Sequence, residues 1–222
     1  MNRAKIKRWS LGVAMTEFVI IAPVLLLLGL SAMQLALLYQ ANNIVSYATF
    51  EAARKGAVNH GNLGPMRREL GKRIAPLFGG DGSANRAHVS ILRGMAEAFD
   101  PRYTKITVLN PTKEAFATYG VDNGEGIVEI PNTYLQFKPR TVDSISKVSI
   151  HDANLLRIQV TYAYRLDVPF VGHIVTATLA ALDPSQARYY LLGRVPLKSI
   201  ATVRMQTPAR ENGSNVSLSD FQ

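Results

Sequence analysis

Residues 7–39 read "KRWSLGVAMTEFVIIAPVLLLLGLSAMQLALLY" and decide the first element of the fold. From Phe18 to Leu38 the run contains no charged residue, and its length is close to the ~20 apolar residues that cross a hydrocarbon core. We therefore predict one transmembrane helix. Glu17 stands at the head of this run, and because a charged side chain within a bilayer is costly, it requires a partner or a function.

The distribution of basic residues predicts the orientation of that helix. Arg3, Lys5, Lys7 and Arg8 precede it, whereas residues 40–50 contain no Lys or Arg. By the positive-inside rule the amino terminus stays in the cytoplasm and residues 40–222 are exported. A cleaved secretory signal has an apolar core of only about 7–15 residues, so we favour a helix that is retained.

The sequence after the apolar run, "QANNIVSYATFEAARKGA" (residues 40–57), continues the helical pattern. One helix from about Phe18 to about Ala57 would be roughly 60 Å long. Steps of three and four residues predict a packing stripe along it. This stripe either docks on the chain's own domain or packs against other subunits in a bundle, and both remain open. Its members are Leu35, Leu38, Asn42, Val45, Thr49, Ala52 and Gly56.

A glycine upstream of the acid offers an explanation for Glu17. If the chain were cut after Gly12, Val13 would be the first residue and Glu17 the fifth. The new α-ammonium, with a pKa of about 7.7–8.0, would carry a positive charge one helical turn from the carboxylate. The amine of a neighbouring subunit could serve equally. Otherwise Glu17 extends to the headgroups of an uncleaved signal anchor.

These residues together carry a family resemblance. Gly12, four small or apolar residues, Glu17-Phe18 and a Pro-containing apolar helix that leads into residues 40–57 resemble the TadE-like family of minor pilins, or pseudopilins. Residues 195–208, "VPLKSIATVRMQTP", are similar to the closing strand of that family. The family belongs to tight-adherence (Tad, Flp, type IVc) pilus systems.

The resemblance implies a processing site at Gly12, Val13, Glu17 and Phe18. A prepilin peptidase would cut after Gly12 on the cytoplasmic side, and Glu17 would guide processing or assembly. The implied partners are other minor pilins, pilus assembly proteins, the peptidase and the lipid bilayer. The implied location is the bacterial inner membrane, with the carboxyl-terminal domain outside the cytoplasm. The alternative is an uncleaved, signal-anchored envelope protein with a binding or scaffolding domain.

The sequence predicts an α+β fold, in which a long amino-terminal helix is followed by a small antiparallel sheet with packed helices. Helical spacing marks residues 63–77 and 85–99, and "LLRIQVTYAYRL" (155–166) alternates as a half-buried strand does. The uncharged stretch 168–182 is short for a membrane span and suits a buried or interfacial helix. Further strands are predicted in 103–110, 121–132, 147–152 and 199–206.

We divide the chain into a basic leader (1–12), a transmembrane helix (13–39), its extension (40–60), an extracytoplasmic α+β domain (61–208) and a flexible tail (209–222). The tail is polar and rich in Gly, Ser and Asn.

Several classes of function find little support in the composition. The chain has no cysteine, which excludes disulfides, thiol catalysis and cysteine-ligated metals. Of its net charge of +9, +6 lies on residues 40–222, where it is spread along the sequence, unlike the clustered charge of a nucleic-acid site. The four histidines stand far apart, and "DNGEG" followed by Glu129 fits a turn better than a calcium loop. We expect no enzyme, metal or cofactor, although a membrane-tethered hydrolase assembled from distant residues remains a third hypothesis.

Overall fold

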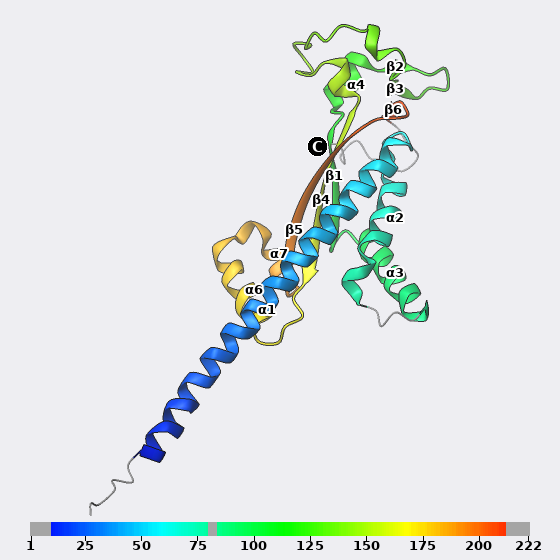
Figure 1. Ribbon diagram of the computed structural model, residues 1–222. Helices are drawn as coiled ribbons and strands as arrows, with labels where there is room; N and C mark the ends of the chain where they lie inside the picture. The colour runs from blue at the N-terminus through cyan, green and yellow to red at the C-terminus, as the bar shows by residue number, and fades with distance from the viewer. Residues whose placement is uncertain (1–9, 80–83, 212–222) are drawn as a thin grey trace, which may run out of the picture.

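A single helix, α1 (Ser10–Ala57), organises the molecule (Figure 1). The computed structural model describes residues 10–79 and 84–211, the first five of these and residue 84 by their backbone alone. The beginning of the leader (1–9), residues 80–83 and residues 212–222 of the predicted tail lie outside these ranges. The first half of α1 projects alone, and the second half packs along the folded domain.

The main sheet has three antiparallel strands, β1 (Thr104–Asn110), β4 (Leu155–Arg165) and β5 (Arg194–Arg204), in the order β1-β4-β5. β4 is central, and its full length pairs with β5, from Leu155 opposite Arg204 to Arg165 opposite Arg194. Alternate apolar residues of β4 join the core with the second half of α1, which explains the period-two pattern of this strand.

Helix α2 (Leu63–Arg73) covers α1 on the other side, and α3 (Ala84–Phe99) packs on α2. α2 begins at Asn62, whose side chain accepts a hydrogen bond from the Gly64 amide. A short 3₁₀ turn, η1 (Ala75–Phe78), follows, and α3 returns along α2. Gly71 and Gly94 lie at the crossing, where a Cβ on Gly94 would be 2.2 Å from the Gly71 carbonyl oxygen. The two backbones therefore touch directly.

A second three-stranded sheet lies at the end of the domain farthest from the free half of α1 (Figure 1). Its strands are β2 (Val121–Asp122), β3 (Val128–Ile130) and β6 (Ala209–Arg210), in the order β2-β3-β6. Helix α4 (Lys113–Tyr119), turn η2 (Leu135–Phe137) and helix α5 (Ile150–Ala153) belong to the same end. The carbonyl of Ala57 accepts hydrogen bonds from the amides of Gln206 and Thr207, so the approach to β6 caps the end of α1.

The segment between β4 and β5 contains α6 (Val171–Leu182), η3 (Pro184–Gln186) and α7 (Ala187–Tyr190). α6 contacts α1 near the point where α1 leaves the domain. We call residues 167–192 the collar.

The α+β architecture and the long amino-terminal helix are confirmed. Three details differ. There are two small sheets rather than one, and the predicted helix 63–77 breaks after Arg73 into η1, with Pro76 in that turn. Residues 147–152 were predicted as a strand, which is wrong. They lead into α5, because Ser149 and Asp152 form a reciprocal capping box that favours a helical turn.

Candidate functional site

The two halves of α1 have different surfaces. From Met15 to Met33 no described side chain is buried, and most of the large apolar residues there are exposed; Phe18, for example, is 71 % exposed. From Gln34 onward one face is buried in the domain. Among the described residues α1 is the one helix long and apolar enough to cross a membrane. Exposed apolar area of this extent is unfavourable in water and favourable in lipid or in a helix bundle.

We call the part of α1 before Gln34 its bare half. The predicted processing residues lie at the start of this half. Gly12 and Val13 fall within the first turns of α1, and their side chains lie outside the described residues. Glu17 and Phe18 are exposed on the helix surface. The Glu17 carboxylate makes no ion pair with another described residue. Helical geometry places it one turn beyond Val13.

The predicted packing stripe divides between the two surfaces. Val45, Thr49 and Ala52 are fully buried against the chain's own domain, Leu38 is partly buried, and Leu35 and Asn42 are exposed. Four small residues outside the predicted stripe complete the buried face. The available signal was the step of seven positions between the first two of them and of four positions between the last two. These residues are Ala41, Ala48, Ala53 and Ala57.

Gln34 marks the boundary between the two halves. Its side chain is 3 % exposed, and its Oε1 accepts a hydrogen bond from the Val168 amide at 3.0 Å. Val168 is the second residue of the collar. The collar therefore covers a polar group of α1 at the point where the bare half ends. No local sequence pattern relates residues that are this far apart in the chain.

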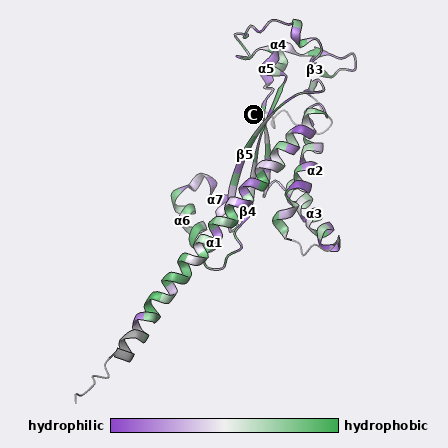
Figure 2. Cartoon of the chain, in the orientation of Figure 1, coloured by the Kyte–Doolittle hydropathy of each residue, from purple (hydrophilic) through white to green (hydrophobic). Residues whose placement is uncertain are grey.

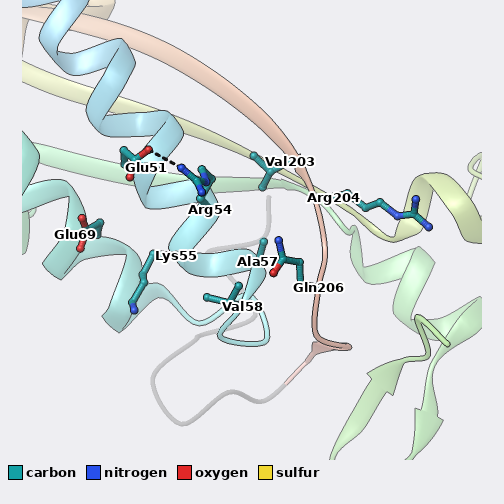
Figure 3. A pocket seen from close by; sticks show the side chains of 9 residues that line it. All are labelled: Glu51, Arg54, Lys55, Ala57, Val58, Glu69, Val203, Arg204 and Gln206. Carbon is teal, nitrogen blue, oxygen red and sulfur yellow. Dashed lines mark hydrogen bonds and ion pairs between the residues drawn. The ribbon is translucent and has the colours of Figure 1, made fainter.

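A cluster of charges lies near the far end of α1, where a cavity of about 330 Å³ opens between α1, α2 and β5 (Figure 3). Glu51 pairs with Arg54 at 3.1 Å and with Arg73 at 3.5 Å, and Arg73 also pairs with Glu69 at 2.8 Å. Each carboxylate thus has a cationic partner, and the cluster ties α1 to α2.

A second polar cluster joins α3 to the main sheet. Glu97 and Arg194 form two hydrogen bonds of 2.7 and 2.9 Å, and the Tyr162 hydroxyl donates to Glu97 at 2.7 Å. Arg194 also lies 4.0 Å from the centre of the Tyr103 ring. Burial raises the pKa of Tyr162, and its hydrogen bond to Glu97 raises it further. Burial alone would lower the pKa of Arg194, but Glu97 outweighs this effect and the pKa is raised.

The other candidate ligands serve the fold. His60 hydrogen-bonds to the Pro208 carbonyl and His151 to that of Lys138. In the "DNGEG" turn Asp122 accepts from the amides of Gly124 and Gly126, and Glu129 pairs with Arg210. No group of three potential metal ligands occurs in the part of the chain that the structure describes.

Helix α1 is also the part of the chain that the family comparison matches. The model of the family described as "TadE-like protein" matches residues 12–54, which begin at Gly12 and end three residues before α1 does. Residues 12–54 are TadE-like. The TadE-like segment therefore includes both the bare half of α1 and the half that holds the domain. Comparisons with curated proteins and with solved structures find no match.

Proposed function

We propose that this chain is a membrane-anchored minor pilin or pseudopilin that takes part in assembling a Tad pilus or a related secretion filament. The coincidence of the TadE-like segment with α1 carries the proposal. One half of this helix is bare and apolar, and the other half holds a folded domain beside it. Such a helix can stay in the bilayer before assembly and pack against other subunits afterwards.

The bare half suits both environments for the same physical reason. Lipid tails and the side chains of neighbouring helices are both apolar, so the surface from Phe18 to Met33 stays out of water in either state. Packing between helices in lipid depends on close contact rather than on the hydrophobic effect. Gly29, where an added Cβ would meet no atom within 4 Å, offers one position for such an approach.

Processing after Gly12 would give Glu17 its partner. The new α-ammonium of Val13, or that of an adjacent subunit, would meet the Glu17 carboxylate in surroundings of low dielectric constant, where an ion pair is stronger than in water. Glu17 is exposed on α1 and free of ion pairs with the other described residues, so it is available for this contact.

The domain is proposed to lie outside the cytoplasm, because four basic residues precede the helix and none follows it closely. A reporter fused after Gln222 should then be active only in the exported compartment. Activity in the cytoplasm would reverse the orientation and remove the pilin role. No catalytic role and no cofactor is proposed for this domain.

The second candidate is an uncleaved, signal-anchored envelope protein. One observation favours it: α1 already begins at Ser10, so the bond between Gly12 and Val13 lies within the helix. A peptidase would have to open this first turn before it could cut, although terminal turns open at little cost in free energy.

The proposed role in assembly is tested by changing Glu17. Glu17→Gln should insert as well as the wild type, because a neutral side chain costs less in lipid, but it should recover less of the other pilins on co-purification. Glu17→Asp keeps the charge and shortens the reach by one methylene, so it should be intermediate. All variants are compared at matched membrane abundance. Equal recovery by wild type and Glu17→Gln would mean that the carboxylate has no part in assembly.

A further inference from the structure

The bare part of α1 beyond Glu17 is too short to span a bilayer by itself. From Phe18 to Met33 it has sixteen residues, which at 1.5 Å per residue gives about 24 Å. The hydrocarbon core is about 30 Å thick. If Glu17 lies at one edge of the core, the opposite edge falls about three residues beyond Gln34, where the collar already contacts one side of the helix.

The surface of the collar is suited to that position. Phe170, Leu182 and Leu191 are 70 %, 75 % and 84 % exposed, and Ile174 and Leu192 are exposed by about half. Ile174 and Leu182 lie on α6 and Phe170 is its N-cap, whereas Leu191 and Leu192 follow α7. Figure 2 shows the hydrophobic colour of α1 continuing onto α6 beside it. A patch of this kind in water would favour aggregation.

The hydroxyl groups of α6 do not oppose contact with lipid. No charged residue occurs between Val168 and Leu182. The hydroxyl of Thr178 donates to the Ile174 carbonyl, and that of Thr176 donates to the Gly172 carbonyl, so both donors are satisfied within the helix. Asp183 and Arg188 lie beyond the end of α6, and the guanidinium of Arg188 stacks on the ring of Tyr189. An uncharged helix of this composition loses little when its exposed side leaves water for lipid.

We infer that the collar is a second membrane-contacting element, and that the exposed side of α6 with Phe170, Leu191 and Leu192 lies in the lipid interface around α1. The occupant of this surface is the bilayer itself, because the surface continues the apolar anchor and begins where that anchor falls short. The inference rests on α1 as the membrane anchor and is independent of its orientation and of any role in a pilus. It fixes the domain close to the membrane, with the β2-β3-β6 end pointing away.

The chain has no cysteine, so single labels can be placed on the full-length protein. Ile174→Cys and Leu191→Cys report on the collar, and Val24→Cys reports on the anchor. Ile145→Cys reports on an exposed apolar site at the β2-β3-β6 end of the domain. Each carries an environment-sensitive fluorophore in phospholipid vesicles. Quenching is measured with lipids that carry a quencher near the headgroup or at mid-chain, and with iodide in the water.

The collar labels should be quenched by the headgroup-proximal lipid quencher, and iodide should quench them at least about threefold less than the Ile145→Cys label. Equal iodide access at Ile174→Cys, Leu191→Cys and Ile145→Cys would overturn the inference. Protection that disappears on about tenfold dilution of protein in lipid would show that a second copy covers the face, and would overturn it too. If the mid-chain quencher fails to reach Val24→Cys, α1 is no anchor and the inference falls with it.

Discussion

The backbone amide of Val168 donates a hydrogen bond to Oε1 of Gln34 across 3.0 Å, although the two residues are 134 positions apart in the chain. Gln34 is the first buried side chain along the described part of α1. This contact therefore defines where the bare anchor ends and where the collar begins. The collar supplies a donor to Oε1 of this polar residue, whereas its Nε2 is buried without a hydrogen-bond partner among the described residues.

Gln34→Leu should loosen the collar. The substitution leaves the buried Val168 amide without an acceptor, which costs about 1–3 kcal/mol. We expect faster hydrogen exchange over residues 166–172 of the variant in vesicles, with little change in α2 and α3. Met33→Leu, one position earlier on the exposed surface, is the matched control and should exchange as the wild type does. Unchanged exchange at residues 166–172 in Gln34→Leu would contradict this role.

Gly94→Ala should destabilise the domain. The added Cβ would lie 2.2 Å from the Gly71 carbonyl oxygen, a backbone atom that can move only if α2 and α3 separate. Overpacking of this kind costs about 1–3 kcal/mol or more. The free energy of unfolding is measured by denaturant titration in detergent. Gly29→Ala, with no atom within 4 Å of its new Cβ, serves as the control, and equal stability of the two variants would refute the close contact of α2 with α3.

Tyr162 should make the domain sensitive to alkali. Burial and the bond to Glu97 raise its pKa above the ordinary value of 10.0. Above that pH the unfolded chain releases the phenolic proton while the folded chain retains it. The contribution of Tyr162 to the free energy of unfolding is therefore fully present below pH 10 and is lost as the pH rises further. Tyr162→Phe removes this proton, and its free energy of unfolding should fall less between roughly pH 9 and pH 11. Identical losses in both proteins would exclude Tyr162 as the source.

Local patterns in the sequence predicted the elements that depend on local physics. The charge-free run from Phe18 to Leu38 predicted the anchor, and strict alternation from Leu156 to Tyr164 predicted the central strand. The capping box at Ser149 and Asp152 was also readable, but the β-branched residues beside it suggested a strand. The capping hydrogen bonds between these two residues favour the helical turn.

The contacts that position the domain were not predictable in this way. Glu97 meets Arg194 and Gln34 meets Val168 across long stretches of chain, and neither pair shares an element or a spacing. The collar shows the same limit. Its uncharged composition indicated a buried or interfacial helix, but only the fold places α6 beside the end of the bare half of α1.

The most direct test of the proposed pilin role is the mass of the protein extracted from membranes of cells that contain the matching prepilin peptidase. We predict a chain that begins at Val13 and lacks residues 1–12. Gly12→Trp should retain those residues, because a subsite that accepts glycine has no room for an indole. Recovery of the full-length wild-type chain beginning at Met1 would contradict the proposed processing and would favour the uncleaved anchor.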